Sequence, residues 1–414
     1  MRSRTLLTTL ALLATATTAA WSAVAQGDAA DVPPAPAAIT ASDPLIAHTL
    51  YTWYRPSSFD KAPVQPLERF SSDDVDHYRR YFSRLRANGV DVIAGVMTGR
   101  PGEKDAAGKP LHTNWESENL LRVIPVVGAS GMKFMIYYDT GIRSWWKNRI
   151  ERGDIRITDP RFRRQVLSDF AWIADEVINR HPDDVLFLQT TAGRRVLDEK
   201  GLPRPVIAIY IARSIRDEPG YAALAKVMDG ELARIFHDRG LGRPALVLDM
   251  VWWGAQAFDP AQAAAYGDNL AALTAFCPVT SAEKDITSLG DWVPRFADLY
   301  SRAANEAADL VGRGELPAGV QVWPGIMPNF EKGSNTRSRA RDLSDWEAML
   351  RMGVTSTRRV GSTDDADPVR SMLIVYSDEF FEGTSLLTDG GLYTLPLTVQ
   401  GNVLKDMGVW LDRF

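Results

Sequence analysis

The sequence predicts an α/β fold, a single (β/α)8 barrel of the TIM type, in which eight parallel strands form a ring inside a layer of helices. Short runs of β-branched and aromatic residues alternate with longer amphipathic stretches, as in repeated βα units. The short runs number eight, and the composition does not change after Pro44, so one barrel is expected. A doubly wound open sheet is the alternative. It is disfavoured because no glycine-rich phosphate loop follows the first run.

The predicted strands are short and rich in Val, Ile, Leu and aromatic residues, which is typical of a parallel sheet buried on both faces. They span residues 46–54, 91–97, 133–138, 206–211, 245–251, 271–276, 319–323 and 372–376.

The predicted helices lie between most of these strands and show the spacing of apolar residues that one buried helix face requires. They span residues 74–88, 162–179, 221–238, 292–311 and 343–352, with a closing helix at 399–412. Four of them end at a glycine, the usual C-terminal cap, at Gly89, Gly240, Gly312 and Gly353. The segment 354–370 is interpreted as a solvated loop, with a flap over the cleft as the alternative.

The first 25 residues are expected to be a signal peptide. Arg2 and Arg4 precede an apolar stretch, and Ala23-Val24-Ala25 has the small-x-small pattern of a cleavage site. Residues 26–44, rich in Ala, Pro and Asp, are expected to be a disordered linker, which leaves 45–414 as the catalytic domain. The protein is therefore expected to be exported, to the periplasm or beyond the cell. The apolar stretch is short for a membrane span, so no membrane is expected in the mature form, with an uncleaved anchor as the alternative.

Composition excludes several classes of partner and cofactor. A net charge of -5 and a pI near 5.7 give no basic field for nucleic acid. Cys277 is the only cysteine, and the five His residues have no metal-ligand spacing, so neither a disulfide nor a metal is expected. No cofactor is expected either, and a monomer is anticipated.

Two carboxylates near the end of the chain indicate the chemistry. Glu379 and Glu382 follow the apolar run 372–375, and Gly383 and Thr384 could supply the turn that brings both acids to one cavity. Cleavage of a glycosidic bond needs two such groups, one to protonate the departing oxygen and one to act as base or nucleophile. The motif therefore predicts a glycoside hydrolase.

Aromatic and polar residues gather where the predicted strands end, which is where barrel enzymes place their active sites. Because sugar rings stack on aromatic side chains, these residues are candidates for binding substrate. Asp249, within an apolar strand, could instead be a hydrogen-bonded structural carboxylate. The candidates are Tyr51, Trp53, Tyr54, Tyr138, Asp139, Tyr210, Asp249, Trp252, Trp323 and Asp378.

Several segments together resemble the endo-α-mannosidases of glycoside hydrolase family 99 and the related family 71/99-like proteins. The resemblance covers roughly residues 51–389. The most specific segment is Asp-Glu-Phe-Phe-Glu-Gly-Thr at 378–384, which is similar to the family's Asn-Glu-Trp-His-Glu-Gly-Thr. The other segments are Tyr-Thr-Trp-Tyr at 51–54, the helix end and strand at 87–93, the Gly-x-Pro segment leading to Ile-Tyr at 201–210, and Trp-Pro-Gly at 323–325.

The resemblance implies a retaining, endo-acting enzyme for α-linked glycans. On this basis Glu379 deprotonates the sugar's own 2-hydroxyl, which attacks the anomeric carbon to give a 1,2-anhydro sugar. Glu382 protonates the departing oxygen and later activates water. Asp378 replaces the family's Asn, and Phe380-Phe381 replace Trp-His, so the identity of the substrate does not carry over.

Other functions remain open from the sequence. An α-glucanase-like or other glycanase could use the same two acids by direct attack or by inversion. A barrel that binds carbohydrate or assembles polysaccharide without catalysis is a further alternative, because fold alone does not establish activity. A cofactor-dependent oxidoreductase is disfavoured, since the sequence carries no nucleotide-binding fingerprint.

Overall fold

The computed structural model describes residues 43–61, 66, 69–104, 108, 113–140, 156–276, 289–328, 343–360, 367–377 and 395–409. The chain divides into two compact units, Met1–Ile39 and Thr40–Phe414, and every described residue belongs to the second. The expected signal peptide and most of the linker lie outside the described residues. In the described part of the chain, no helix combines the length and the apolar character needed to cross a membrane.

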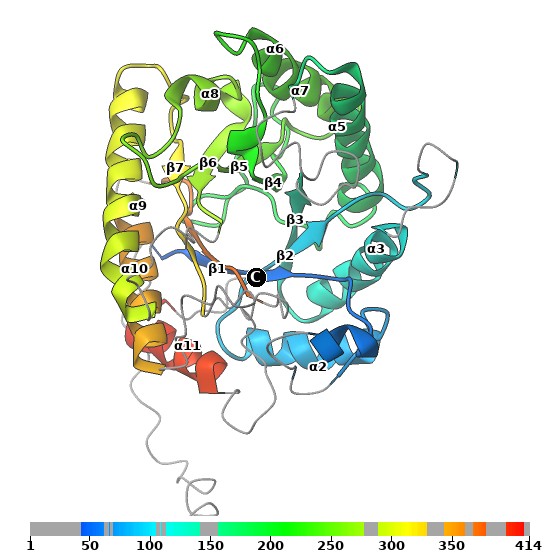
Figure 1. Cartoon of the computed structure of the whole chain (residues 1–414), viewed down its shortest axis with the longest axis vertical. Helices are drawn as coiled ribbons and strands as arrows, with labels where there is room; N and C mark the ends of the chain where they lie inside the picture. Colours follow the sequence, from blue (N-terminus) through cyan, green and yellow to red (C-terminus); the bar gives the residue numbers. More distant parts are fainter. Residues whose placement is uncertain are drawn as a thin grey trace, which may run out of the picture. The chain divides into compact units, whose positions relative to one another are not determined.

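Within the described residues, one parallel sheet forms the centre of the second unit (Figure 1). Its strands lie in the order β7-β6-β5-β4-β3-β2-β1-β9-β8, so nearly all strands that follow one another in sequence are also neighbours in space. The strands are β1 Leu45–Leu50, β2 Val92–Met97, β3 Lys133–Asp139, β4 Val206–Tyr210, β5 Ala245–Asp249, β6 Leu270–Thr274, β7 Gln321–Val322, β8 Gly325–Ile326 and β9 Met372–Val375.

The run 321–326 closes this sheet into a barrel. β7 pairs with β6, β8 pairs with β9, and only Trp323 and Pro324 separate the two short strands. The Trp323 amide donates to Leu273 O at 2.8 Å, and the Ile374 amide donates to Pro324 O at 2.9 Å. The run therefore occupies a single position in a ring of eight, which confirms the predicted (β/α)8 barrel and all eight predicted strands.

Glycine is required where the ring closes. A Cβ on Gly325 would lie 2.2 Å from the carbonyl oxygen of Ala275 and 2.3 Å from the Tyr376 ring. Real side chains do not approach so closely, so a larger residue would push β8 away from its neighbours.

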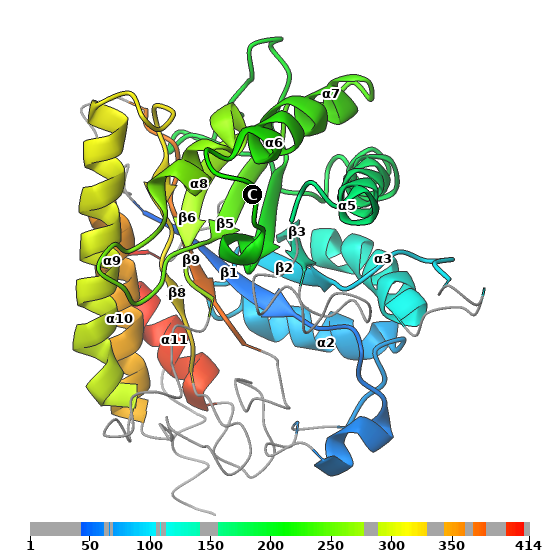
Figure 2. The ribbon, with the colours of Figure 1, turned by 45° about the horizontal axis from the view of Figure 1, so that its top comes forward.

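The helices alternate with the strands and cover the outside of the barrel (Figures 1 and 2). α9 and α10 lie side by side, and α10 also contacts β8 and β9. π-helical segments, Ile173–Ile178 and Lys226–Glu231, extend α5 and α6. The helices are α2 Val75–Arg86, α3 Thr113–Ala129, α5 Pro160–Trp172, α6 Ala222–Ala225, α7 Leu232–His237, α8 Pro260–Ala264, α9 Leu289–Gly312, α10 Leu343–Val360 and α11 Leu395–Asp406.

Local sequence explains where several helices begin and end. Asp74, Asp159 and Asp259 are N-caps whose carboxylates accept hydrogen bonds from the first turns of α2, α5 and α8. Proline, which needs no amide partner, follows directly in α5 and α8. Gly89 and Gly240 take the positive φ values, 84° and 74°, predicted for glycines that end helices.

The structure corrects the helix prediction at several places. α3 and α8 are absent from the predicted helices; α3 carries Pro125 inside an apolar stretch, and α8 is a single short turn. α10 continues to Val360, so residues 354–360 are helical rather than loop. Gly353 is therefore inside a helix and not a cap. A Cβ there would lie 2.7 Å from Leu373 Cδ1, so the glycine lets α10 pack against β9.

Candidate functional site

Four aromatic rings meet inside the barrel at the carboxyl ends of the strands. Tyr137 belongs to β3, Tyr210 ends β4, and Phe276 and Tyr376 follow β6 and β9. The Tyr137 ring centroid lies 6.1 to 6.2 Å from the other three, and Phe276 lies 4.5 Å from Tyr376. Strands β3 and β9 are not neighbours, so their side chains can meet only across the interior. We call these four residues the interior aromatic cluster.

The cluster combines buried and accessible rings. Tyr137 and Tyr376 are buried, whereas Tyr210 and Phe276 are half-buried. Rings with one accessible face at the carboxyl end of a barrel suit the apolar faces of sugars. Only Tyr210 is among the sequence-predicted site residues; Tyr137, Phe276 and Tyr376 are additional.

Tyr138, the predicted neighbour of Tyr137, faces the opposite way. Its hydroxyl donates to Asp169 Oδ2 on α5 at 2.6 Å, and its ring packs edge-on against Phe170. Successive side chains of a strand point to opposite faces, so Tyr138 contacts the helix layer and Tyr137 faces the interior. Arg100, in the loop after β2, pairs with the same Asp169 at 2.9 Å and joins that loop to α5.

The three aromatic residues after β1 separate into two groups. Tyr51 and Trp53 lie together, with ring centroids 4.5 Å apart, and Trp53 is half-buried. Tyr54 is fully buried and packs against Phe59 and Phe70 at 5.2 and 5.8 Å. The Tyr54 ring is therefore enclosed by protein, while Trp53 retains an accessible surface.

Asp249 is a fully buried carboxylate whose oxygens are occupied by protein donors. It accepts hydrogen bonds from the amides of Ile211 and Phe276 at 2.9 and 3.0 Å, and it pairs with Arg213 at 2.9 Å. Because these donors come from beyond β4 and β6, Asp249 ties the ends of three adjacent strands together. This is the hydrogen-bonded structural carboxylate that the sequence left as an alternative.

The loop after β4 is held in a strained conformation beside this carboxylate. Ile211 has a φ of 51°, which is uncommon for a β-branched residue and costs on the order of 1–3 kcal/mol. The hydrogen bond from its amide to Asp249 holds that geometry. Arg213 then lies over the half-buried Trp252, 4.3 Å from the ring centroid. Trp252 is thus fixed at the rim by a cation–π contact.

Two further predicted residues lie at the same end. Asp139 ends β3, is nearly buried, and pairs in register with Tyr210 of β4. Trp323 is buried where the barrel closes, and its indole donates to Gln321 Oε1 at 2.7 Å. Asp378, Glu379 and Glu382 lie outside the described residues.

The described chain reaches Ser377, whose position is fixed by two residues of β1. Thr49 Oγ1 donates to Ser377 O at 2.6 Å and accepts from the Ser377 amide at 3.0 Å. The Ser377 hydroxyl lies 3.1 Å from His48 Nδ1, and His48 Nε2 lies 3.0 Å from Gln400 Oε1 on α11. Burial lowers the pKa of His48 to about 3, against a smaller rise from the Gln400 hydrogen bond, so the imidazole is neutral.

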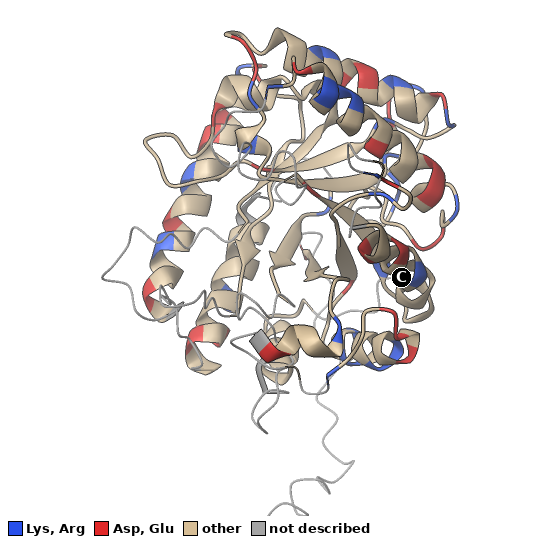
Figure 3. Cartoon of the chain, turned by 45° about the vertical axis from the view of Figure 1, so that its right-hand side comes forward, with Lys and Arg blue, Asp and Glu red and all other residues tan. Residues whose placement is uncertain are grey.

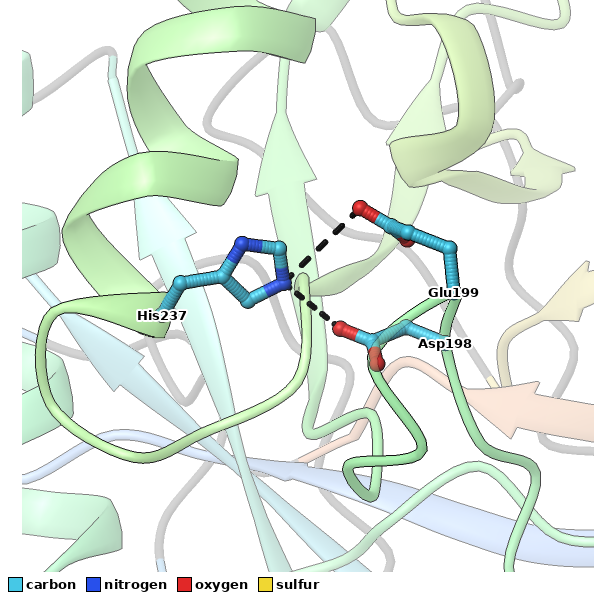
Figure 4. A group of neighbouring side chains, drawn as sticks. All are labelled: Asp198, Glu199 and His237. Atoms are coloured by element: carbon cyan, nitrogen blue, oxygen red, sulfur yellow. Dashed lines mark hydrogen bonds and ion pairs between the residues drawn. The ribbon is translucent and has the colours of Figure 1, made fainter.

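One group of possible metal ligands is present among the described residues, Asp198, Glu199 and His237 (Figure 4). These residues precede β4 and β5, so they lie at the amino-terminal end of the barrel. Asp198 Oδ2 accepts from His237 Nε2 at 2.7 Å and from the Arg243 amide at 2.9 Å. Arg243 also pairs with Glu199 at 3.0 Å. A guanidinium thus already supplies the positive charge that a metal would bring.

The pKa of Asp198 agrees with a carboxylate that is held by protein hydrogen bonds. Burial alone would raise the pKa of Asp198, but hydrogen bonds from the Leu202 amide, His237 and the Arg243 amide outweigh it and hold the pKa below its ordinary range. We name Asp198, Glu199, His237 and Arg243 the amino-end ion cluster. In the view of Figure 3, acidic and basic residues are interspersed along the described outer helices.

Comparison with known proteins supports the fold. No protein-family model matches the chain, and no curated protein matches its sequence. Among solved structures, the GH99 endo-alpha-mannosidase from Bacteroides thetaiotaomicron is similar with a TM-score of 0.52 and 13% identity, over 87% of this chain and 96% of that chain. A "glycoside hydrolase-like protein" is similar with a TM-score of 0.56 and 13% identity, over 90% of this chain and 97% of that chain. At these identities the likeness shows a shared fold, a barrel of the kind that these glycoside hydrolases have.

Proposed function

We propose that the protein is a glycoside hydrolase that cleaves α-linked polysaccharide or glycan. The observation that carries this proposal is the interior aromatic cluster at the carboxyl ends of the strands, because rings with accessible faces suit sugars. Tyr376, a member of the cluster, is followed in sequence within six residues by both Glu379 and Glu382. The similarity of fold to an endo-alpha-mannosidase gives additional support.

In the proposed reaction, the two acids divide the proton transfers between them. Glu382 gives its proton to the departing oxygen as the glycosidic bond breaks. For a mannose-configured substrate, Glu379 takes the proton of the 2-hydroxyl, whose oxygen bonds to the anomeric carbon. In the second step water attacks that carbon and gives a proton to Glu382, while the 2-oxygen regains its proton from Glu379. Two displacements at one carbon retain its configuration.

The rings proposed to contact the sugar are those with accessible surface. Trp53, Tyr210 and Trp252 are half-buried at the carboxyl end, and Tyr51 packs against Trp53. Asp139 and Asp378 are proposed polar contacts. Tyr54, Tyr138 and Trp323 are enclosed by protein, so the proposal gives them the task of supporting that end of the barrel. Export and a monomeric state are part of the same proposal.

The test is an assay of the purified protein against mannans, α-glucans and acidic polysaccharides, with separation of the products and NMR of the first-formed anomer. We expect release of α-linked oligosaccharides from one class, with retained configuration. An inverted anomer would favour the glycanase alternative that activates water directly. Binding without release of any product would favour the non-catalytic barrel and would end the proposal of hydrolysis.

A further inference from the structure

Tyr137 carries a buried hydroxyl that has no hydrogen-bond partner among the described residues. Buried polar groups are paired in nearly all cases, because an unpaired donor loses its hydrogen bonds to water without replacement. A tyrosine hydroxyl in particular finds a partner when it is buried. The exception at Tyr137 therefore requires an explanation.

The position of Tyr137 supplies one. In the register of the sheet it lies between Val96 of β2 and Ala208 of β4, both small enough to leave the ring room in the interior. Around it are Tyr210, Phe276 and Tyr376, from three other strand ends. The unpaired hydroxyl thus belongs to the same end of the barrel as the half-buried rings that could stack on a ligand.

The proton of this hydroxyl is firmly held. Burial is the main cause that raises the pKa of Tyr137 well above 10, and the charges of Tyr376, Asp249 and Tyr51 raise it further. The group remains a neutral donor throughout the pH range in which the protein is expected to work. A neutral donor among aromatic rings suits an uncharged ligand that offers both oxygen acceptors and apolar C–H faces, which is the chemistry of a sugar ring.

We infer that Tyr137 is a substrate-binding residue whose hydroxyl donates a hydrogen bond to an oxygen of the bound glycan, directly or through one water. This inference rests on the proposed function and adds a residue that is not among the predicted site residues. The hydroxyl is closed to solvent beside the half-buried Tyr210 and Phe276 rings, which touch edge to face with centroids 4.6 Å apart, so the inference requires that a ligand oxygen or a bridging water reach it past these two rings.

A second buried tyrosine offers a matched control. Tyr266 is fully buried, and its hydroxyl also has no hydrogen-bond partner among the described residues. Burial raises its pKa as well. It follows α8 and precedes β6, on the amino-terminal side of the barrel and away from the interior aromatic cluster. Replacement of either tyrosine by phenylalanine removes one unpaired buried hydroxyl, but only one of the two hydroxyls is placed to meet a sugar.

The experiment compares Tyr137→Phe and Tyr266→Phe in the full chain. Thermal unfolding gives stability, and calorimetry with α-mannan oligosaccharides and with maltooligosaccharides gives affinity. Both variants should unfold at the wild-type temperature or higher, because each loses an unsatisfied donor. Tyr137→Phe should bind the recognised oligosaccharide about five- to tenfold more weakly, the loss of one hydrogen bond, and should raise KM by a similar factor. Tyr266→Phe should bind it as the wild type does.

Each outcome has a distinct meaning. Wild-type affinity in Tyr137→Phe, with an oligosaccharide that the wild-type protein binds, overturns the inference and leaves the proposed function standing. Weaker binding in both variants by the same factor also overturns it, because the effect would then follow from loss of any buried hydroxyl. If the wild-type protein binds neither class of oligosaccharide, the inference and the assignment of these substrates fail together. Unchanged or raised stability combined with weaker binding in Tyr137→Phe alone supports it.

Discussion

Two buried polar groups at opposite ends of the barrel, Asp198 and Tyr137, differ in how fully the protein satisfies them. At the amino-terminal end, Asp198 accepts hydrogen bonds from the amides of Lys200 and Leu202 on one oxygen and from His237 and Arg243 on the other. At the carboxyl-terminal end, Tyr137 keeps an unpaired hydroxyl, within the described residues, among half-accessible rings. A saturated network has no hydrogen-bonding capacity left for a ligand, whereas an unpaired donor has.

Residue type alone would have placed the functional site at the amino-terminal end of the barrel. A histidine with two carboxylates looks more like a functional centre than a tyrosine in an apolar strand does. The two groups differ in whether their polar atoms already have hydrogen-bond partners and in the end of the barrel on which they lie. The amino-terminal face of a barrel serves stability, and the carboxyl face carries the chemistry. Position is needed as well as pairing, because Tyr266 is unpaired within the described chain and yet lies away from the cluster.

The largest effect is expected from removal of a proposed catalytic acid. Glu382→Gln should lower kcat/KM by about 10³-fold or more, because glutamine cannot protonate the departing oxygen. The unfolding temperature should stay near the wild-type value. Glu199→Gln, a carboxylate of the amino-end ion cluster that is more than half exposed, is the control and should leave kcat/KM unchanged. Turnover at the wild-type rate in Glu382→Gln would show that this acid near the end of the chain is not catalytic.

The second effect is a loss of stability at the amino-terminal end. Asp198→Ala should lower the free energy of unfolding by about 3 kcal/mol, because His237, Arg243 and two amides lose a fully enclosed charged acceptor. Urea denaturation measures this change, and kcat on the folded variant should not move. Glu199→Gln, with its exposed side chain, should cost less than about 1 kcal/mol. An Asp198→Ala variant that keeps its stability but loses activity would reverse the comparison between the two ends.

The third effect is a pH dependence of stability caused by His48, a saturated polar residue near the carboxyl end. Its pKa falls from an ordinary 6.5 to about 3 on folding, so the unfolded chain binds the proton first as the pH decreases. The contribution of the neutral imidazole to the free energy of unfolding is full above pH 6.5 and is lost progressively down to about pH 3. At pH 5.5 the loss should be about 1.4 kcal/mol.

Comparison with His48→Gln isolates this contribution. The glutamine does not titrate, so the stability advantage of the wild-type protein over the variant should shrink by about 1.4 kcal/mol between pH 7.5 and pH 5.5. Urea denaturation at the two pH values provides the measurement. An advantage that stays constant or grows as the pH falls would contradict the neutral, buried imidazole.

The fold could be predicted from the sequence because each strand is a short apolar run between helical patterns. All eight runs became strands of the ring, including the run at 319–323, whose continuation through Gly325–Ile326 closes it. Helix α3 could not be predicted with the same ease. Its apolar residues surround Pro125, which reads as a helix breaker until the tertiary packing is known.

The candidate site was less accessible to sequence analysis for a different reason. Residues 134–139 of β3 are all buried, so hydrophobicity does not alternate and cannot tell which of Tyr137 and Tyr138 faces the interior. A shift of β3 by one residue would exchange the side chains that face the interior with those that face the helices. Asp249 shows the same limit, since its charge marks it as unusual, but only the amides of Ile211 and Phe276 reveal that its oxygens are already engaged.

The smallest effect is expected at Trp53, whose buried indole N–H is another unpaired donor at the carboxyl end within the described chain. Trp53→Phe keeps a ring beside Tyr51 but removes that donor. If the indole binds a glycan oxygen, affinity for the recognised oligosaccharide should fall about two- to fivefold in calorimetry, in line with the net value of one hydrogen bond. The free energy of unfolding should change by less than about 1 kcal/mol, because a half-buried site gains little from the larger ring. A loss of stability without any loss of affinity would show that Trp53 packs against the barrel rim and does not bind the ligand.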